Sequence, residues 1–217
     1  MVVKSGSVAS VNREVWGLSA GEATGGVPSI LARPAASVVV LSWHSGNPEA
    51  SAEAVRAAGA WLKRLHAAPC VCDDPLDPRD ALLRRRDAWL ERACDDLDVS
   101  RVEALDFDAF EGVQRVTCHR DFTPSNWLWD TECGLTVVDF GQSRPDVALW
   151  DLVKLEAELF RAQPQLREAF YGAYRALGVE DEARLQTLVL LHGLQTAVWG
   201  DTHDAAEFSA LGRAILE

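Results

Sequence analysis

Two short segments near the middle of the chain decide the fold: Cys118–Asn126, which reads CHRDFTPSN, and Val137–Gly141, which reads VVDFG. Short β-rich stretches at 113–118, 127–129 and 134–140 surround them, so a single β-hairpin can connect the two segments. Either segment alone is common in unrelated proteins. Both together, in this order and on either side of a hairpin, predict one polar site built from two neighbouring loops.

The residue types in these segments suit phosphate chemistry with magnesium. The patterns H-R-D-x-x-x-x-N and D-F-G are both parts of the protein-kinase signature. Phosphoryl transfer from ATP needs a carboxylate beside the attacking hydroxyl and oxygen ligands for Mg²⁺. We expect Asp121 to orient the acceptor hydroxyl and take its proton, and Asn126 and Asp139 to hold the metal.

With these motifs, the chain resembles the aminoglycoside-phosphotransferase-like branch of the protein-kinase-like superfamily, whose members are small-molecule kinases. No A-P-E segment follows Gly141; instead Pro145–Leu152 leads directly to an Asp-Leu pair. The resemblance implies that Asp151 supports the backbone of the loop around His119. The usual family form of that loop is H-G-D, so Arg120 is a departure, and its side chain is expected to find an acid nearby.

The resemblance extends upstream of the two motifs. Val2-Val3-Lys4 looks like the strand whose lysine binds the α- and β-phosphates of ATP, and Glu14 resembles the glutamate that pairs with that lysine. The stretch Val38–His44 looks like the last strand of the small lobe running into the hinge between two lobes. The resemblance implies that backbone groups of three hinge residues face the adenine: Leu41, Ser42 and Trp43.

Only three residues precede Lys4. A complete kinase-like small lobe has two strands and a glycine-rich phosphate-covering loop before the lysine strand. We therefore expect these parts to be missing from this chain and the remaining sheet to expose an edge. Gly21, Gly25 and Gly26 follow the helix predicted after Lys4, so they cannot supply that loop.

Composition excludes several other classes of function. The net charge is −12, which disfavours binding to nucleic acid or to an anionic membrane. The five cysteines are scattered, and no apolar run is long enough to cross a membrane or to serve as a signal peptide. These features predict a cytoplasmic chain with reduced thiols.

The negative charge is concentrated in the second half, where residues 101–217 carry 20 acidic and 10 basic side chains. Such a surface attracts cationic small molecules, or it only keeps the chain soluble. In relatives the C-terminal helices help to line the acceptor pocket. The acids proposed on this basis to meet substrate ammonium groups are Asp201, Asp204 and Glu207.

Hydrophobic periodicity completes the prediction. Strands are expected at 2–4 and 37–42, and helices over about 9–22, 49–67, 80–97, 148–161, 164–177, 180–200 and 204–216. The strands and helices are segregated, which favours an α+β fold. We expect a two-lobed, protein-kinase-like fold: an N-terminally truncated small β lobe at 1–43 and a helical lobe at 44–217.

The predicted function is ATP- and Mg²⁺-dependent transfer of the γ-phosphate to a hydroxyl of a small, cationic molecule. Aminoglycoside-type antibiotics are the leading class, which would make the chain an antibiotic-resistance enzyme. Choline, homoserine or a sugar-like acceptor stays open. The alternative from a different class is a non-catalytic remnant or binding module that lacks the phosphate-covering loop.

Overall fold

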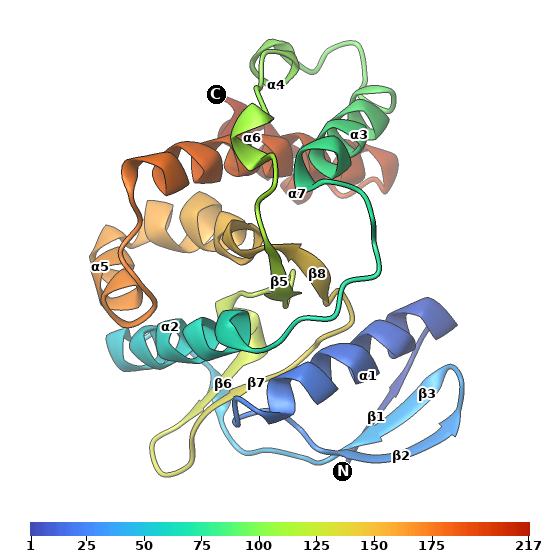
Figure 1. The fold of residues 1–217 in the computed structure, drawn as a ribbon, viewed down its shortest axis with the longest axis vertical. Coiled ribbons are helices and arrows are strands. Elements are labelled where there is room, and N and C mark those ends of the chain that lie inside the picture. The colour runs from blue at the N-terminus through green and yellow to red at the C-terminus, as the bar shows by residue number, and fades with distance from the viewer.

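The N-terminal lobe is a three-stranded antiparallel sheet with one helix beside it, and the computed structural model describes it together with the rest of residues 1–217 (Figure 1). The strand order is β1-β3-β2, and Lys4 lies opposite Val39 in the register. The elements are β1 (Val2–Ser5), α1 (Val8–Glu22), β2 (Ile30–Ala35) and β3 (Val38–Leu41). The predicted lysine strand, the helix after it and the strand before the hinge are all present.

The rest of the chain forms a larger, mainly helical lobe, with α4, α6 and α7 in the half away from the small sheet (Figure 1). Its helices are α2 (Ala52–Ala67), α3 (Pro78–Leu90), α4 (Ser100–Glu103), α5 (Pro164–Ala173), α6 (Val179–Thr202) and α7 (Ala206–Leu216), with a 3₁₀ turn η1 at Asp108–Phe110. None of the helices is long and apolar enough to cross a bilayer. The fold is α+β with two lobes, as predicted.

Short strands at the centre of the large lobe carry the two motif segments. Strand β5 (Arg115–Cys118) pairs with β8 (Arg144–Val147), and β6 (Trp127–Asp130) pairs with β7 (Gly134–Val137) and with β4 (Asn47–Pro48). The first motif loop connects β5 to β6, and the second follows β7. The β6–β7 hairpin therefore returns the chain to the same side of the lobe, which brings both loops together.

The phenylalanines of the two motifs anchor both loops in one core. Phe122 stacks on Trp61 of α2 at 5.7 Å between ring centroids, and Phe140 meets the same indole edge-on at 6.1 Å. All three side chains are buried within a single cluster of 37 buried residues. Burying a large aromatic side chain contributes on the order of 2–3 kcal/mol, so each loop is held in the core by its phenylalanine.

Three differences from the prediction have local causes. Strands β2 and β8 were not expected, because Ala-Arg-Pro-Ala and Arg-Pro-Asp-Val lack the alternation of a half-buried strand; β2 pairs with two register shifts. The helix expected over 80–97 ends at Leu90. The helix expected over 148–161 is a 3₁₀ segment, η3 (Ala148–Leu152), followed by a π-helical segment, η4 (Leu155–Phe160).

Helices α6 and α7 approach each other closely because glycines lie at their contact. A Cβ atom on Gly212 would lie 2.6 Å from the Gly193 carbonyl oxygen and 2.6 Å from Ala197 Cα, both in the backbone of α6. We expect Gly212→Ala to lower the free energy of unfolding by about 1–3 kcal/mol, the usual cost of overpacking. Urea unfolding measures this. Gly172→Ala, with open space around the added methyl, is the control; equal stability of the two variants would contradict the close packing.

Candidate active site

The first motif loop is closed by the side chain of Asn126. Its amide Nδ2 donates hydrogen bonds to the backbone oxygen of Asp121 at 2.8 Å and to Asp121 Oδ2 at 3.2 Å. The turn that makes this possible is the 3₁₀ segment η2 (Pro124–Asn126), in which the proline occupies the first helical position. The structure thus brings Asp121 and Asn126 into direct contact.

The side chain of Asp151 holds the backbone of the same loop through two hydrogen bonds. Its carboxylate accepts hydrogen bonds from the backbone N–H groups of His119 at 2.9 Å and Arg120 at 2.6 Å. Arg120 has a φ of 70°, a conformation that L-residues rarely adopt. Because Asp151 is buried and also contacts His66 Nε2 at 3.0 Å, it fixes this strained turn relative to α2.

His119 connects the two motif loops. Its Nε2 lies 3.0 Å from the backbone oxygen of Val138, and its ring packs on Phe140 at 4.6 Å. Burial lowers the pKa of His119, so the ring is neutral at pH 7. Nε2 then carries the hydrogen and donates a hydrogen bond to the Val138 backbone oxygen. This leaves Nδ1 to accept a hydrogen bond from the backbone N–H of Asp121 at 3.3 Å.

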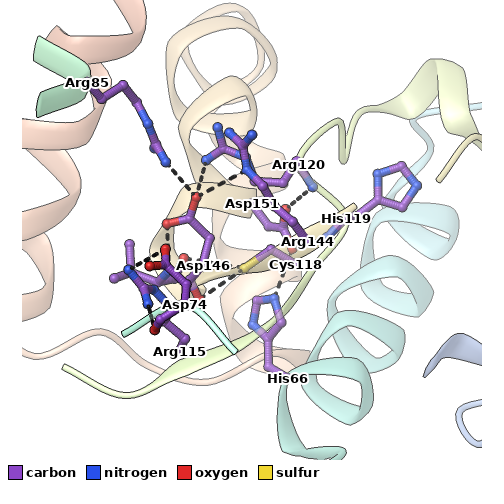
Figure 2. A network of polar contacts seen from close by, with 11 residues as sticks. His66, Asp74, Arg85, Arg115, Cys118, His119, Arg120, Arg144, Asp146 and Asp151 are labelled. Carbon is purple, nitrogen blue, oxygen red and sulfur yellow. Dashed lines mark hydrogen bonds and ion pairs between the residues drawn. The ribbon is translucent and has the colours of Figure 1, made fainter. Parts of the chain in front are cut away.

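Arg120 belongs to a buried cluster around one carboxylate (Figure 2). Asp146 Oδ2 lies 3.0 Å from Arg120 Nη1, 3.0 Å from Arg85 Nη2 and 3.7 Å from Arg144 Nε. Burial alone would raise the pKa of Asp146, but the three guanidinium groups outweigh it and lower the pKa. Arg120 and Arg85 also lie over the ring of Trp150, at 4.2 and 4.5 Å. The cluster ties the first motif loop to β8 and α3.

Lys4 joins the small lobe to the second motif loop. Its Nζ lies 3.0 Å from Glu14 Oε2 and 2.7 Å from Asp139 Oδ1. Glu14 is buried, whereas the side chain of Asp139 is 53% exposed and therefore open to a ligand. Arg13 of the same helix donates to the Gly141 carbonyl oxygen at 2.8 Å. The structure thus brings Lys4 and Glu14, from the start of the chain, into contact with the second motif loop at Asp139.

The donor set of the two loops fits Mg²⁺. Magnesium takes oxygen ligands and is commonly bound by one or two side chains plus phosphate and water. Asn126 uses its Nδ2 toward Asp121, so its Oδ1 is available as a ligand. Asp139 has a φ of 67° and an exposed carboxylate, of which one oxygen contacts Lys4. Both residues therefore have a side-chain oxygen available to a metal ion.

A cavity of about 390 Å³ opens beside Asp121. Its wall combines aromatic side chains from α3, η3, α6 and α7: Trp89, Trp150, Trp199 and Phe208. Two charged residues of the wall were not predicted. Lys154 Nζ lies 2.5 Å from Asp121 Oδ1, and Glu158 follows four residues later in the π-helical segment. The cavity has the position expected of an acceptor pocket.

Glu158 is the wall carboxylate without a cationic partner. The nearest basic group is His192 Nε2, at 4.0 Å. Burial lowers the pKa of His192 to about 3, so that ring is neutral at pH 7. Burial also raises the pKa of Glu158, and this effect outweighs the positive charge of Lys154, which lowers it. No sequence motif marks Glu158, and its spacing of four residues from Lys154 would indicate a shared face only in a regular α-helix, which this segment is not.

The structure does not bring the three expected acids of the last helices to this cavity. Asp201 lies two residues beyond Trp199, which turns it by about 200° to another face of α6. There it pairs with Arg213 at 3.2 Å and accepts a hydrogen bond from Ser209 at 2.5 Å. Asp204 lies in the turn between α6 and α7, and Glu207 is exposed next to it. Net acidity of a half-chain does not specify which helix face carries it.

The expected hinge residues lie where β3 leaves the small lobe. Leu41 is buried, and Ser42 donates its N–H to the Ser29 carbonyl oxygen at 2.9 Å. Trp43 follows with a largely exposed side chain. Their contact with adenine stays a prediction.

Comparison with known proteins agrees with this geometry. The sequence model of the phosphotransferase enzyme family matches residues 31–188. No curated protein matches the sequence. A choline/ethanolamine kinase family protein from Mesorhizobium loti is 21% identical and superposes with a TM-score of 0.69, over 94% of this chain and 76% of the other.

Two further solved structures have the same fold. The GDP complex of aminoglycoside 2'-phosphotransferase-IIIa is 13% identical with a TM-score of 0.70, over 100% of this chain and 91% of the other. The choline kinase of Streptococcus pneumoniae is 16% identical with a TM-score of 0.68, over 99% and 85%. The motifs, the fold and the matched residues together identify this chain as a member of the phosphotransferase enzyme family, and thus as a small-molecule phosphotransferase with a kinase-like fold.

Proposed function

We propose that this enzyme transfers the γ-phosphate of ATP, with Mg²⁺, to a hydroxyl group of a small cationic molecule. The observation that carries the proposal is that two sets of polar side chains lie on neighbouring loops, where Val138, next to Asp139, donates its N–H to the Asn126 backbone oxygen at 3.0 Å. Asp121 and Asn126 form one set, and Asp139 with the Lys4–Glu14 ion pair forms the other. Phosphoryl transfer requires little more than such positioning and charge.

Each residue has a role that follows from its atoms. Asp121 orients the acceptor hydroxyl and accepts its proton. Asn126 and Asp139 would hold Mg²⁺, which neutralises charge on the phosphates when bound. Lys4 binds the α- and β-phosphates and is held in place by Glu14. The backbone of Leu41, Ser42 and Trp43 receives the adenine.

A cationic acceptor is supported by Glu158 rather than by the acids of the last helices. Glu158 offers an unpaired carboxylate, and the aromatic side chains around it can face an ammonium group. Structural neighbours include enzymes solved with gentamicin and kanamycin, as well as choline kinases. An aminoglycoside-type antibiotic is the first acceptor class to test, followed by choline-like alcohols. A cytoplasmic location agrees with the use of ATP and with five free cysteines.

Calorimetric titration with ATP and Mg²⁺ tests the nucleotide site. We expect wild-type binding that weakens at least about 10-fold when Mg²⁺ is removed or when Asp139 is changed to Asn. Asparagine tolerates the left-handed backbone of this position, so the variant removes charge without new strain. Asp95→Asn, an exposed acid without a partner, is the matched control.

The alternative function, a non-catalytic binding module, predicts a different result. Wild-type protein that binds no ATP at millimolar concentration, with or without Mg²⁺, would contradict the proposed transfer. Binding that is equal in wild type and Asp139→Asn would contradict the role given to Asp139.

A further inference from the structure

The residue closest to the side chain of Asp121 is a lysine from outside both motifs. Lys154 lies between η3 and η4, and its Nζ is 2.5 Å from Asp121 Oδ1. The two side chains are 33% and 30% exposed and line the same cavity. This ion pair is open to an incoming substrate, unlike the buried cluster at Asp146.

The other cations near the site already have firm partners. Lys4 is shared between Glu14 and Asp139. Arg120 is buried against Asp146, with its side chain 8% exposed and its guanidinium on Trp150. Lys154 has a single carboxylate partner, and that partner is the acid proposed to receive the acceptor's proton. Its ammonium is therefore the positive charge free to move onto a reacting group.

The distribution of lysine in the chain points the same way. Of 21 basic residues only three are lysines, at positions 4, 63 and 154. Two of these three form ion pairs with carboxylates of the site: Lys4 with Asp139 and Lys154 with Asp121. Lysine differs from arginine as a compact charge on a flexible stem with three rotatable donors. Such a group can follow a phosphoryl group that changes position during transfer.

We propose that Lys154 is a catalytic residue whose ammonium binds the non-bridging oxygens of the phosphoryl group as it passes from ATP to the acceptor. This inference rests on the proposed function. In the step, the acceptor oxygen forms a bond to the γ-phosphorus, and the bond to the β,γ-bridging oxygen breaks. ADP leaves with that electron pair, and the acceptor proton passes to Asp121.

Distance and charge both support this assignment. An acceptor oxygen within hydrogen-bond reach of Asp121 lies about 3 Å from its carboxylate, next to the Lys154 ammonium. The transferred phosphoryl group has a loose transition state with charge on its equatorial oxygens. A preorganised cation at that point stabilises the transition state more than bound ATP, and therefore raises kcat more than it lowers KM.

Hydrolysis of ATP with water as acceptor tests the proposal without knowledge of the natural acceptor. We expect Lys154→Met to lower kcat for hydrolysis by about 100-fold, as for the loss of one oxyanion donor, with the KM for ATP almost unchanged. Lys154→Arg keeps the charge and is expected to restore a large part of the rate. Lys63→Met, which removes an exposed lysine of α2, is the matched control and should equal wild type.

A second measurement separates contact with the phosphoryl group from a role in placing Asp121. ADP, Mg²⁺ and aluminium fluoride together imitate the planar transferring group. We expect wild type to bind this mixture more tightly than ADP and Mg²⁺ alone, and Lys154→Met to lose that gain. Equal binding of ADP and Mg²⁺ by both proteins shows that the variant is folded.

The outcomes are distinct. Lys154→Met with hydrolysis within about 3-fold of wild type, or with the full gain from aluminium fluoride, would overturn the assignment of Lys154. Wild-type protein that neither binds nor hydrolyses ATP would overturn the proposed function, and the role of Lys154 with it.

Discussion

Replacing Asp121 by Asn is expected to lower turnover by about 1,000-fold while nucleotide binding stays close to wild type. A positioned general base contributes about 10²- to 10⁴-fold to a rate. Asn keeps the size and can still accept a hydrogen bond from Asn126, but it cannot take the acceptor proton. It also removes the partner of Lys154.

Single-turnover transfer or hydrolysis, together with ATP calorimetry, measures both parts of this expectation. Asp204→Asn is the control: the same substitution at an acid in the turn between α6 and α7, where a φ of 53° also suits asparagine. Turnover of Asp121→Asn within 10-fold of wild type would exclude Asp121 as the base, since it falls below the range for general-base catalysis.

Replacing Asp146 by Asn is expected to destabilise the fold by about 3–5 kcal/mol, because it leaves three arginines around a neutral group. Burial already lowers the pKa of Arg120 to about 9, which shows how far this charge depends on its carboxylate partner. The pair Arg86–Asp87, in which the Asp87 side chain is 57% exposed, provides the contrast. Asp87→Asn should cost less than about 1 kcal/mol, as for other surface ion pairs.

The sign of the pH dependence follows from the lowered pKa of Asp146. A carboxyl group whose pKa is lower in the folded state stabilises the fold above its unfolded pKa of about 4, and that contribution is lost as the pH falls through the folded pKa. Urea unfolding of wild type and Asp146→Asn should therefore differ most near neutral pH and converge in acid. A difference below 1 kcal/mol at pH 7 would mean that the cluster is solvated.

Order along the chain was enough to predict which motif residues lie close together. Asp121, Asn126 and Asp139 were expected together because a hairpin separates their loops. In the structure Asn126 contacts Asp121, and its backbone oxygen accepts the N–H of Val138, next to Asp139. Lys4 and Glu14 were expected to pair because the resemblance to the kinase-like family implies it, and the structure places them 3.0 Å apart. Local patterns succeed where a short connection leaves the chain few alternatives.

Lys154 and Glu158 were missed for a physical reason. They lie where the helix changes from a 3₁₀ to a π-helical segment, so the usual 3.6-residue period does not report which way their side chains point. The prediction that acids of the last helices line the cavity does not match the structure for a related reason. Their number was known, but Asp201 is turned toward Arg213 by the register of α6, which only packing against α7 determines.

The shared anchoring of the two motif loops has a consequence for how this enzyme can diverge. The two motif loops are held in the core beside α2 by three buried side chains, Phe122, Phe140 and His119. In contrast, two side chains of the cavity wall, Trp199 of α6 and Phe208 of α7, are about 40% exposed. Mutations that reshape the wall leave that anchor untouched. The exposed outer wall at Trp199 and Phe208 can therefore change its shape, and with it the accepted substrate, without disturbing the buried residues that hold the two motif loops.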